Sequence, residues 1–132
     1  MNRRRHVATT IYLALTGIFA LGAFIQPFTA GIGIFGGSID AHQGIGWLLH
    51  ALTVLGFLAA LISPARRRDA PLAFALTAIV TIQVSVVGAD ATAIKALHPF
   101  LGVSSLLLAV AIHLLAGRTR EARSAPAAQR VG

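Results

Sequence analysis

Four long apolar runs constrain this chain more than any other feature of its sequence. They cover residues 7–28, 41–63, 71–88 and 94–116. A helix of about 20 apolar residues, rising ~1.5 Å per residue, crosses the ~30 Å hydrocarbon core of a bilayer. Charged residues make up only 11% of the chain, whereas a soluble domain carries about a quarter. The sequence therefore predicts an all-α integral membrane protein whose four spans pack as a four-helix bundle.

One transmembrane domain, residues 7–117, accounts for most of the 132 residues. A basic segment, residues 1–6, precedes it, and a polar tail, residues 118–132, follows it and is predicted to be disordered. The first run is longer than the core of a signal peptide, about 7–15 residues, which favours an uncleaved span. Local signals place Asp40 as an N-cap, Pro71 in the first turn of the third helix and Gly117 as a C-cap.

The basic residues indicate how the spans are oriented. The N-terminus, the connection between the second and third spans, and the tail hold all of them except Lys95. Cytoplasmic connections are the ones enriched in Lys and Arg, so the pattern predicts both termini in the cytoplasm. We expect a multi-pass protein of the bacterial inner membrane with the lipid bilayer as its main partner. The net charge of +7 forms no single face, so no nucleic-acid partner is predicted.

A short pattern occurs twice, each time bridging two apolar runs. It consists of Ile-Gln, a spacer of similar length, and His-x-x-x-Gly. The first copy contains Gln26, His42 and Gly46, and the second contains Gln83, His98 and Gly102. Repeats of this kind predict two duplicated helical hairpins related by a pseudo-two-fold axis along the membrane normal. A chance match of so short a pattern is the alternative.

The two repeated histidines are candidate metal ligands. His42 and His98 are expected at matching depth near the outer ends of the second and fourth helices, facing across the bundle. Two neutral imidazoles in this arrangement are what a bis-His-ligated haem b requires. Gly46 and Gly102 would leave room for the edge of the macrocycle. Two unrelated interfacial histidines would give the same sequence pattern, so this alternative stays open.

The remaining polar residues have simpler explanations. Gln26 and Gln83 could orient a histidine or bind a propionate, but hydrogen bonding between helices explains them as well. His50 is expected to bond to a neighbouring helix, and His113 to face the cytoplasmic headgroups. Trp47 fits the aromatic belt at the outer interface.

His6 and Pro99 are the last residues to be interpreted. His6 belongs to the basic N-terminus. Pro99 predicts that His98 either caps its helix or sits at a kink.

Several chemistries are not indicated. The absence of cysteine excludes disulfides and thiolate metal sites. No acidic residue lies inside a span, which argues against proton- or cation-coupled transport. The H-E-x-x-H motif, the P-loop, the dinucleotide fingerprint and an acyl-transfer constellation are all missing. No enzymatic activity is predicted.

One stretch resembles a known family. The pattern F-G-G-x-x-D-A-H-x-x-x-G-x-x-L-H from Phe35 to His50, with L-H-P at Leu97–Pro99, resembles small bacterial four-helix membrane proteins classed as a domain of unknown function. That resemblance would cover about residues 7–117 and implies no activity. More distantly, the chain is similar to one four-helix half of haem A synthase and to membrane b-type cytochromes. In the synthase, histidines stand on the second and fourth helices, as His42 and His98 do here, but its paired loop cysteines are absent.

Three function classes follow from these observations. The first is a small cytochrome-like protein that binds haem b and passes electrons to a redox partner or another membrane subunit. The second is a cofactor-free accessory or assembly subunit whose histidines bond between helices. The third is a component of a small transporter or channel.

Overall fold

In a computed structural model, the backbone is described for residues 3–124 and the side chains for residues 7–116. Within that range the chain is helical and contains no strand. The elements are α1 (Arg3–Ile34), α2 (Asp40–Leu61), α3 (Arg66–Val86), the short α4 (Thr92–Lys95) and α5 (Leu97–Ser124). Four of them are long and apolar enough to cross a membrane. The predicted all-α architecture with four helices of membrane-spanning length and composition is therefore confirmed.

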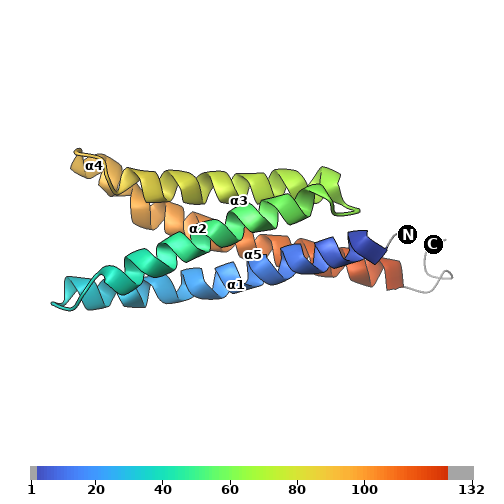
Figure 1. The fold of residues 1–132 in the computed structure, drawn as a ribbon, viewed down its shortest axis with the longest axis horizontal. Helices are drawn as coiled ribbons and strands as arrows, with labels where there is room; N and C mark the ends of the chain where they lie inside the picture. The colour runs from blue at the N-terminus through green and yellow to red at the C-terminus, as the bar shows by residue number, and fades with distance from the viewer. Residues whose placement is uncertain (1–2, 125–132) are drawn as a thin grey trace.

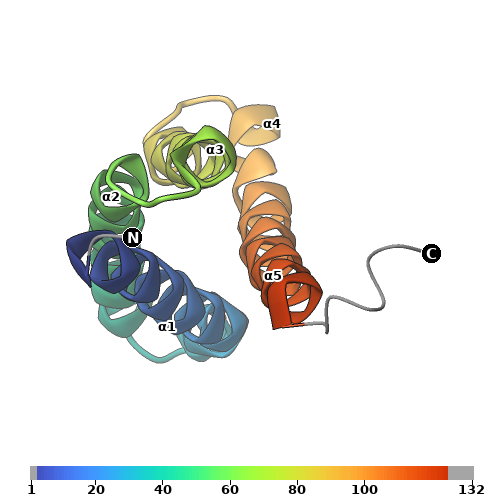
Figure 2. The ribbon, with the colours of Figure 1, turned by 90° about the vertical axis from the view of Figure 1, so that its right-hand side faces the viewer.

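The four long helices form a ring in chain order. Each packs against the next, and α5 returns to α1, so that α2 and α5 lie diagonally opposite one another (Figure 2). The α1–α2 turn and α4 lie at one end of the bundle, which we call the α4 end. The α2–α3 turn lies at the other end with the first turn of α1 and the last turn of α5 (Figure 1). We call this second end the Asp69 end, after the acidic residue in the first turn of α3.

The interior of the ring is lined mainly by small side chains. Ala60 and Ala109 are fully buried. Tyr12 and Phe19 are buried among them, but many other large apolar side chains face outward: Phe24 is 71% exposed and Leu21 is 63% exposed. In a bilayer the hydrophobic effect does not drive large residues inward, whereas small residues let helix backbones approach. This distribution fits a protein whose outer surface contacts lipid.

The predicted end of the first helix, at Phe28, is wrong. α1 continues through Pro27 to Ile34, because backbone groups at membrane depth must be satisfied and a helix satisfies them internally. It stops where Gly36 takes a φ of 97°, a conformation that favours glycine. The Gly37 N–H then donates to the Ile32 carbonyl at 2.8 Å, which satisfies one of the last free carbonyls of the helix.

Two predicted helix starts also need correction. Ile39, not Asp40, occupies the N-cap of α2, and the Asp40 N–H donates to Ser38 Oγ at 3.0 Å. α3 begins at Arg66, so Pro71 lies inside the helix rather than in its first turn. The earlier start follows from the bonds of the Arg68 and Asp69 N–H groups to the Ala65 carbonyl, each 2.9 Å.

The end of the last helix differs from its prediction as well. Gly117 is not a C-cap, because α5 passes through it to Ser124. The first part of the tail, 118–124, is thus helical rather than disordered, in keeping with its content of Ala, Arg and Glu, which favour helix. The prediction of disorder for residues 125–132 lies outside the described part of the chain.

Candidate functional site

The structure brings the two repeated histidines into contact. His42 stands in the first turn of α2 and His98 in the first turn of α5, both at the α4 end. Their ring centroids are 5.9 Å apart and the ring planes are inclined by 67°. Both side chains are half-buried. Because α2 and α5 are diagonal neighbours in the ring, the two imidazoles meet across the bundle.

Pro99 does not disturb the helix that carries His98. α4 ends at Lys95, and α5 starts at Leu97 after a break at Ala96. Pro99 therefore lies in the first turn of α5, where backbone N–H groups have no partner within the helix. His98 is thus helical and sits immediately after the break, rather than capping the helix or lying at a kink within it.

Both histidines donate a hydrogen bond to a backbone carbonyl of the preceding long helix. His42 Nδ1 lies 3.2 Å from the Gln26 carbonyl oxygen, and His98 Nδ1 lies 2.9 Å from that of Gln83. A carbonyl oxygen can only accept, so the hydrogen must be on Nδ1 in each ring. In the neutral form each Nε2 then carries a lone pair. This is the tautomer that binds a metal through Nε2.

The two carbonyls are available for different reasons. Gln83 stands in the last turn of α3, whose final carbonyl groups lack partners within the helix. Gln26 lies inside α1, and its carbonyl also accepts from Thr29 Oγ1 at 2.9 Å. Thr29 Oγ1 lies 3.4 Å from His42 Nδ1 as well. The acceptor of His42 therefore also has the hydroxyl of a buried threonine beside it.

The glutamine side chains occupy the space beside the two glycines. A Cβ atom at Gly46 would stand 3.2 Å from Gln26 Nε2, and one at Gly102 would stand 3.0 Å from Gln83 Nε2. Gln26 Nε2 also donates to the His42 carbonyl at 3.1 Å, which is a bond between helices. The glutamine, histidine and glycine of both copies therefore gather in one place. Each glutamine contacts its histidine through the main-chain carbonyl, a role that side-chain reasoning could not identify.

The other histidines lie elsewhere. His50 Nε2 is 3.0 Å from Thr81 Oγ1 of α3, so the predicted bond to a neighbouring helix is confirmed. The His113 ring packs against α1, since a Cβ atom at Gly17 would stand 3.3 Å from its Nε2. Trp47 is 64% exposed. The side chain of His6 lies outside the described residues.

The histidine pair offers two ligands and no more. Within the described residues no group of three or more His, Cys, Asp or Glu side chains could hold a metal ion. Zinc takes three or four protein ligands, so the pair is too small for it. Haem iron arrives with the four nitrogens of its macrocycle and needs only axial ligands from the protein. The donor set therefore fits haem better than a bare zinc ion.

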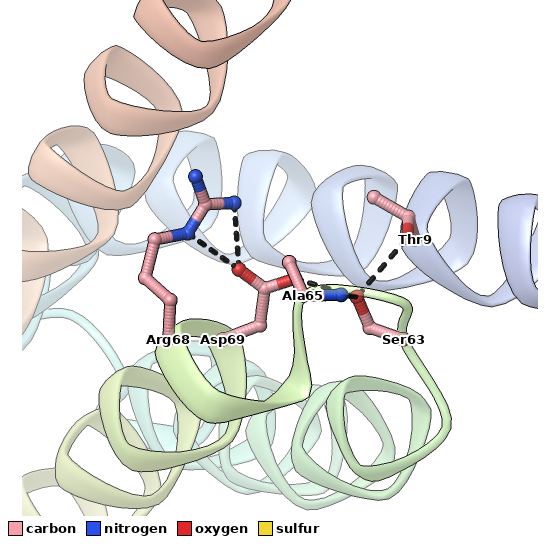
Figure 3. Close-up of polar contacts among 5 residues, drawn as sticks. All are labelled: Thr9, Ser63, Ala65, Arg68 and Asp69. Atoms are coloured by element: carbon pink, nitrogen blue, oxygen red, sulfur yellow. Dashed lines mark hydrogen bonds and ion pairs between the residues drawn. The ribbon is translucent and has the colours of Figure 1, made fainter.

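A second polar cluster, at the Asp69 end, was not predicted from the sequence (Figure 3). Asp69 is 1% exposed. Its carboxylate accepts from Ser63 Oγ at 2.6 Å and from Arg68 Nε at 2.8 Å. Ser63 Oγ also accepts from the Ala65 N–H at 3.1 Å and lies 3.1 Å from Thr9 Oγ1 of α1. The cluster ties the α2–α3 turn to α1. The signal in the sequence was a lone acidic residue among arginines.

Comparison of the chain with protein-family models, with curated proteins and with solved structures found no match.

Proposed function

We propose that His42 and His98 are the axial ligands of a haem b, and that the protein is a small cytochrome-like membrane protein. The proposal is based on the contact between the two imidazole rings and on the hydrogen bonds from both Nδ1 atoms to backbone carbonyls. Nothing else among the described side chains combines two strong metal ligands in this way. The distant resemblance to membrane b-type cytochromes and to half of haem A synthase supports the same proposal.

The spacing of the rings supports the fit. The two ring centroids are 5.9 Å apart on diagonally opposite helices, so both imidazoles would be within reach of a single iron. The macrocycle edges would enter beside Gly46 and Gly102, where the flexible ends of the Gln26 and Gln83 side chains must turn aside.

The residues of the chain would prepare the site in two ways. The Nδ1–H bonds to Gln26 and Gln83 hold the ring orientations and increase the basicity of the ligating nitrogens. Bound haem would supply one-electron chemistry there. A role in electron transfer, with a redox partner or another membrane subunit, follows from that chemistry.

A cofactor-free accessory or assembly subunit is the competing proposal. It is favoured by the glutamine amides, which fill the space beside the glycines and leave the helix contacts complete without a cofactor. A haem-loading experiment distinguishes the haem-binding protein from the cofactor-free subunit. We expect the protein, purified after expression with added haem, to show a Soret band that shifts and sharpens on reduction. A colourless protein under these conditions would support the accessory subunit and overturn haem binding.

We also propose that the two hairpins are parallel repeats and that both termini lie in the cytoplasm of a bacterial inner membrane. The support is the position of the basic residues at the Asp69 end, including Arg66 and Arg67, which are exposed in the α2–α3 turn region. Reporter fusions placed after Ile39 and after Arg68 are expected to report opposite compartments. Activity of the same reporter at both positions would contradict the topology.

A further inference from the structure

His50 carries an acceptor that the bundle does not use. The Thr81 hydroxyl lies 2.8 Å from the Thr77 carbonyl, to which it donates its single hydrogen. The bond between Thr81 Oγ1 and His50 Nε2, 3.0 Å long, must therefore take its hydrogen from the histidine. With the hydrogen on Nε2, Nδ1 of the neutral ring holds a lone pair. No described residue donates to this nitrogen.

The unused acceptor lies at membrane depth. His50 stands halfway along α2, so about 16 Å of helix separates it from either end. The ring is only half-buried, and its hydrogen bond to Thr81 lies on the exposed surface. A polar atom at this depth without a hydrogen-bond partner is costly, so binding of a molecule that donates a hydrogen bond to Nδ1 would be favourable.

An aromatic surface adjoins this acceptor. The Trp47 ring centroid lies 6.0 Å from that of His50, with the two planes inclined by 49°. Trp47 is 64% exposed, so most of its ring area is open to the bilayer. A second aromatic ring could lie against it at the usual stacking or edge distances. The site thus combines an apolar aromatic surface with one hydrogen-bond acceptor.

We infer that this site binds a lipid-soluble quinol. A ring hydroxyl of the quinol donates to His50 Nδ1, the ring lies against Trp47, and the apolar tail remains in the bilayer. This site is distinct from the His42–His98 pair, and the inference does not depend on haem binding there.

Other occupants match the acceptor less well. Acyl chains of phospholipids have no donor, and their headgroups lie at the interface. A second copy of the chain offers few hydroxyls, because the exposed ones on α3 and α5 already donate within their own helices. Ser85 donates to the Thr81 carbonyl, and Ser104 donates to the Phe100 carbonyl, at 2.8 and 2.9 Å. A quinol brings both the donor and the aromatic ring.

The single tryptophan of the chain makes a direct binding assay available. Protein grown with 5-fluorotryptophan has one fluorine signal, from position 47. We expect a short-tailed benzoquinol, added under argon to haem-free protein in phosphatidylcholine nanodiscs, to shift this signal saturably. The dimethyl ether of the same quinol has no donor and should bind about tenfold more weakly or worse.

Variants of the acceptor complete the test. His50→Leu should weaken quinol binding by about tenfold or more, whereas His113→Leu, at the α1–α5 contact, should leave it unchanged. Circular dichroism would confirm that both variants remain folded. Equal shifts with the quinol and its dimethyl ether would show simple partitioning and overturn the inference. A fluorine signal that shifts with protein concentration and not with added quinol would overturn the inference and indicate that a second copy of the chain covers the site.

Discussion

Replacing either His42 or His98 with alanine is expected to abolish the low-spin haem spectrum. In the proposed site each ring would supply one of the two nitrogens that the iron takes from the protein, and a single ligand would not maintain six-coordinate iron. Even the loss of a residue that only supports a ligand costs about 10–100-fold in metal affinity, so the loss of a ligand should exceed the upper part of that range. Optical titration of the purified variants with haem, in the oxidised and reduced states, measures this effect.

Matched variants make the expectation specific to the pair. His50→Ala and His113→Ala should leave the spectrum nearly unchanged, since their rings contact Thr81 and Gly17 instead. Gln83→Ala should also retain haem, because the acceptor of the His98 bond is the main-chain carbonyl. Loss of haem in His50→Ala with retention in His98→Ala would identify a different ligand pair.

Removal of the buried carboxylate at the Asp69 end is expected to cause the largest loss of stability. Asp69→Ala leaves the Ser63 hydroxyl without its carboxylate acceptor and removes the carboxylate partner of Arg68, whose side chain is about one-third exposed. Arg68 can therefore turn toward water, which moderates the cost. We expect the free energy of unfolding to fall by about 2–4 kcal/mol. Reversible unfolding in mixed detergent micelles, followed by circular dichroism, gives the value.

Asp90→Ala provides the control for charge alone. Asp90 is also acidic, but it is exposed in the connection before α4, so its replacement should change stability by no more than ~0.5 kcal/mol. Equal effects of the two substitutions would mean that the cluster at the Asp69 end contributes no more than a surface charge. Asp69→Asn keeps an acceptor for Ser63, so its loss of unfolding free energy should lie between those of Asp69→Ala and Asp90→Ala.

The sequence was sufficient to predict the number of membrane helices and the residues that would gather at the α4 end. Length and hydropathy identify spans because the bilayer core has a fixed thickness. The repeated pattern identified Gln26, His42 and Gly46 and their counterparts, since a residue's position along a helix sets its depth in the bundle. Helix ends were less predictable, because α1 continues past Phe28, where the predicted span ends, and α5 continues past the predicted C-cap at Gly117.

Only the tertiary structure decided which atoms meet. Whether the His42 and His98 rings touch depends on the rotation and crossing of α2 and α5, which are set by packing among all the helices of the bundle. The same packing selects main-chain carbonyls as the partners of both Nδ1 atoms, and it buries Asp69 beside Ser63. These contacts join residues far apart along the chain. The periodicity of a single helix carries no information about the neighbour that its side chains will face.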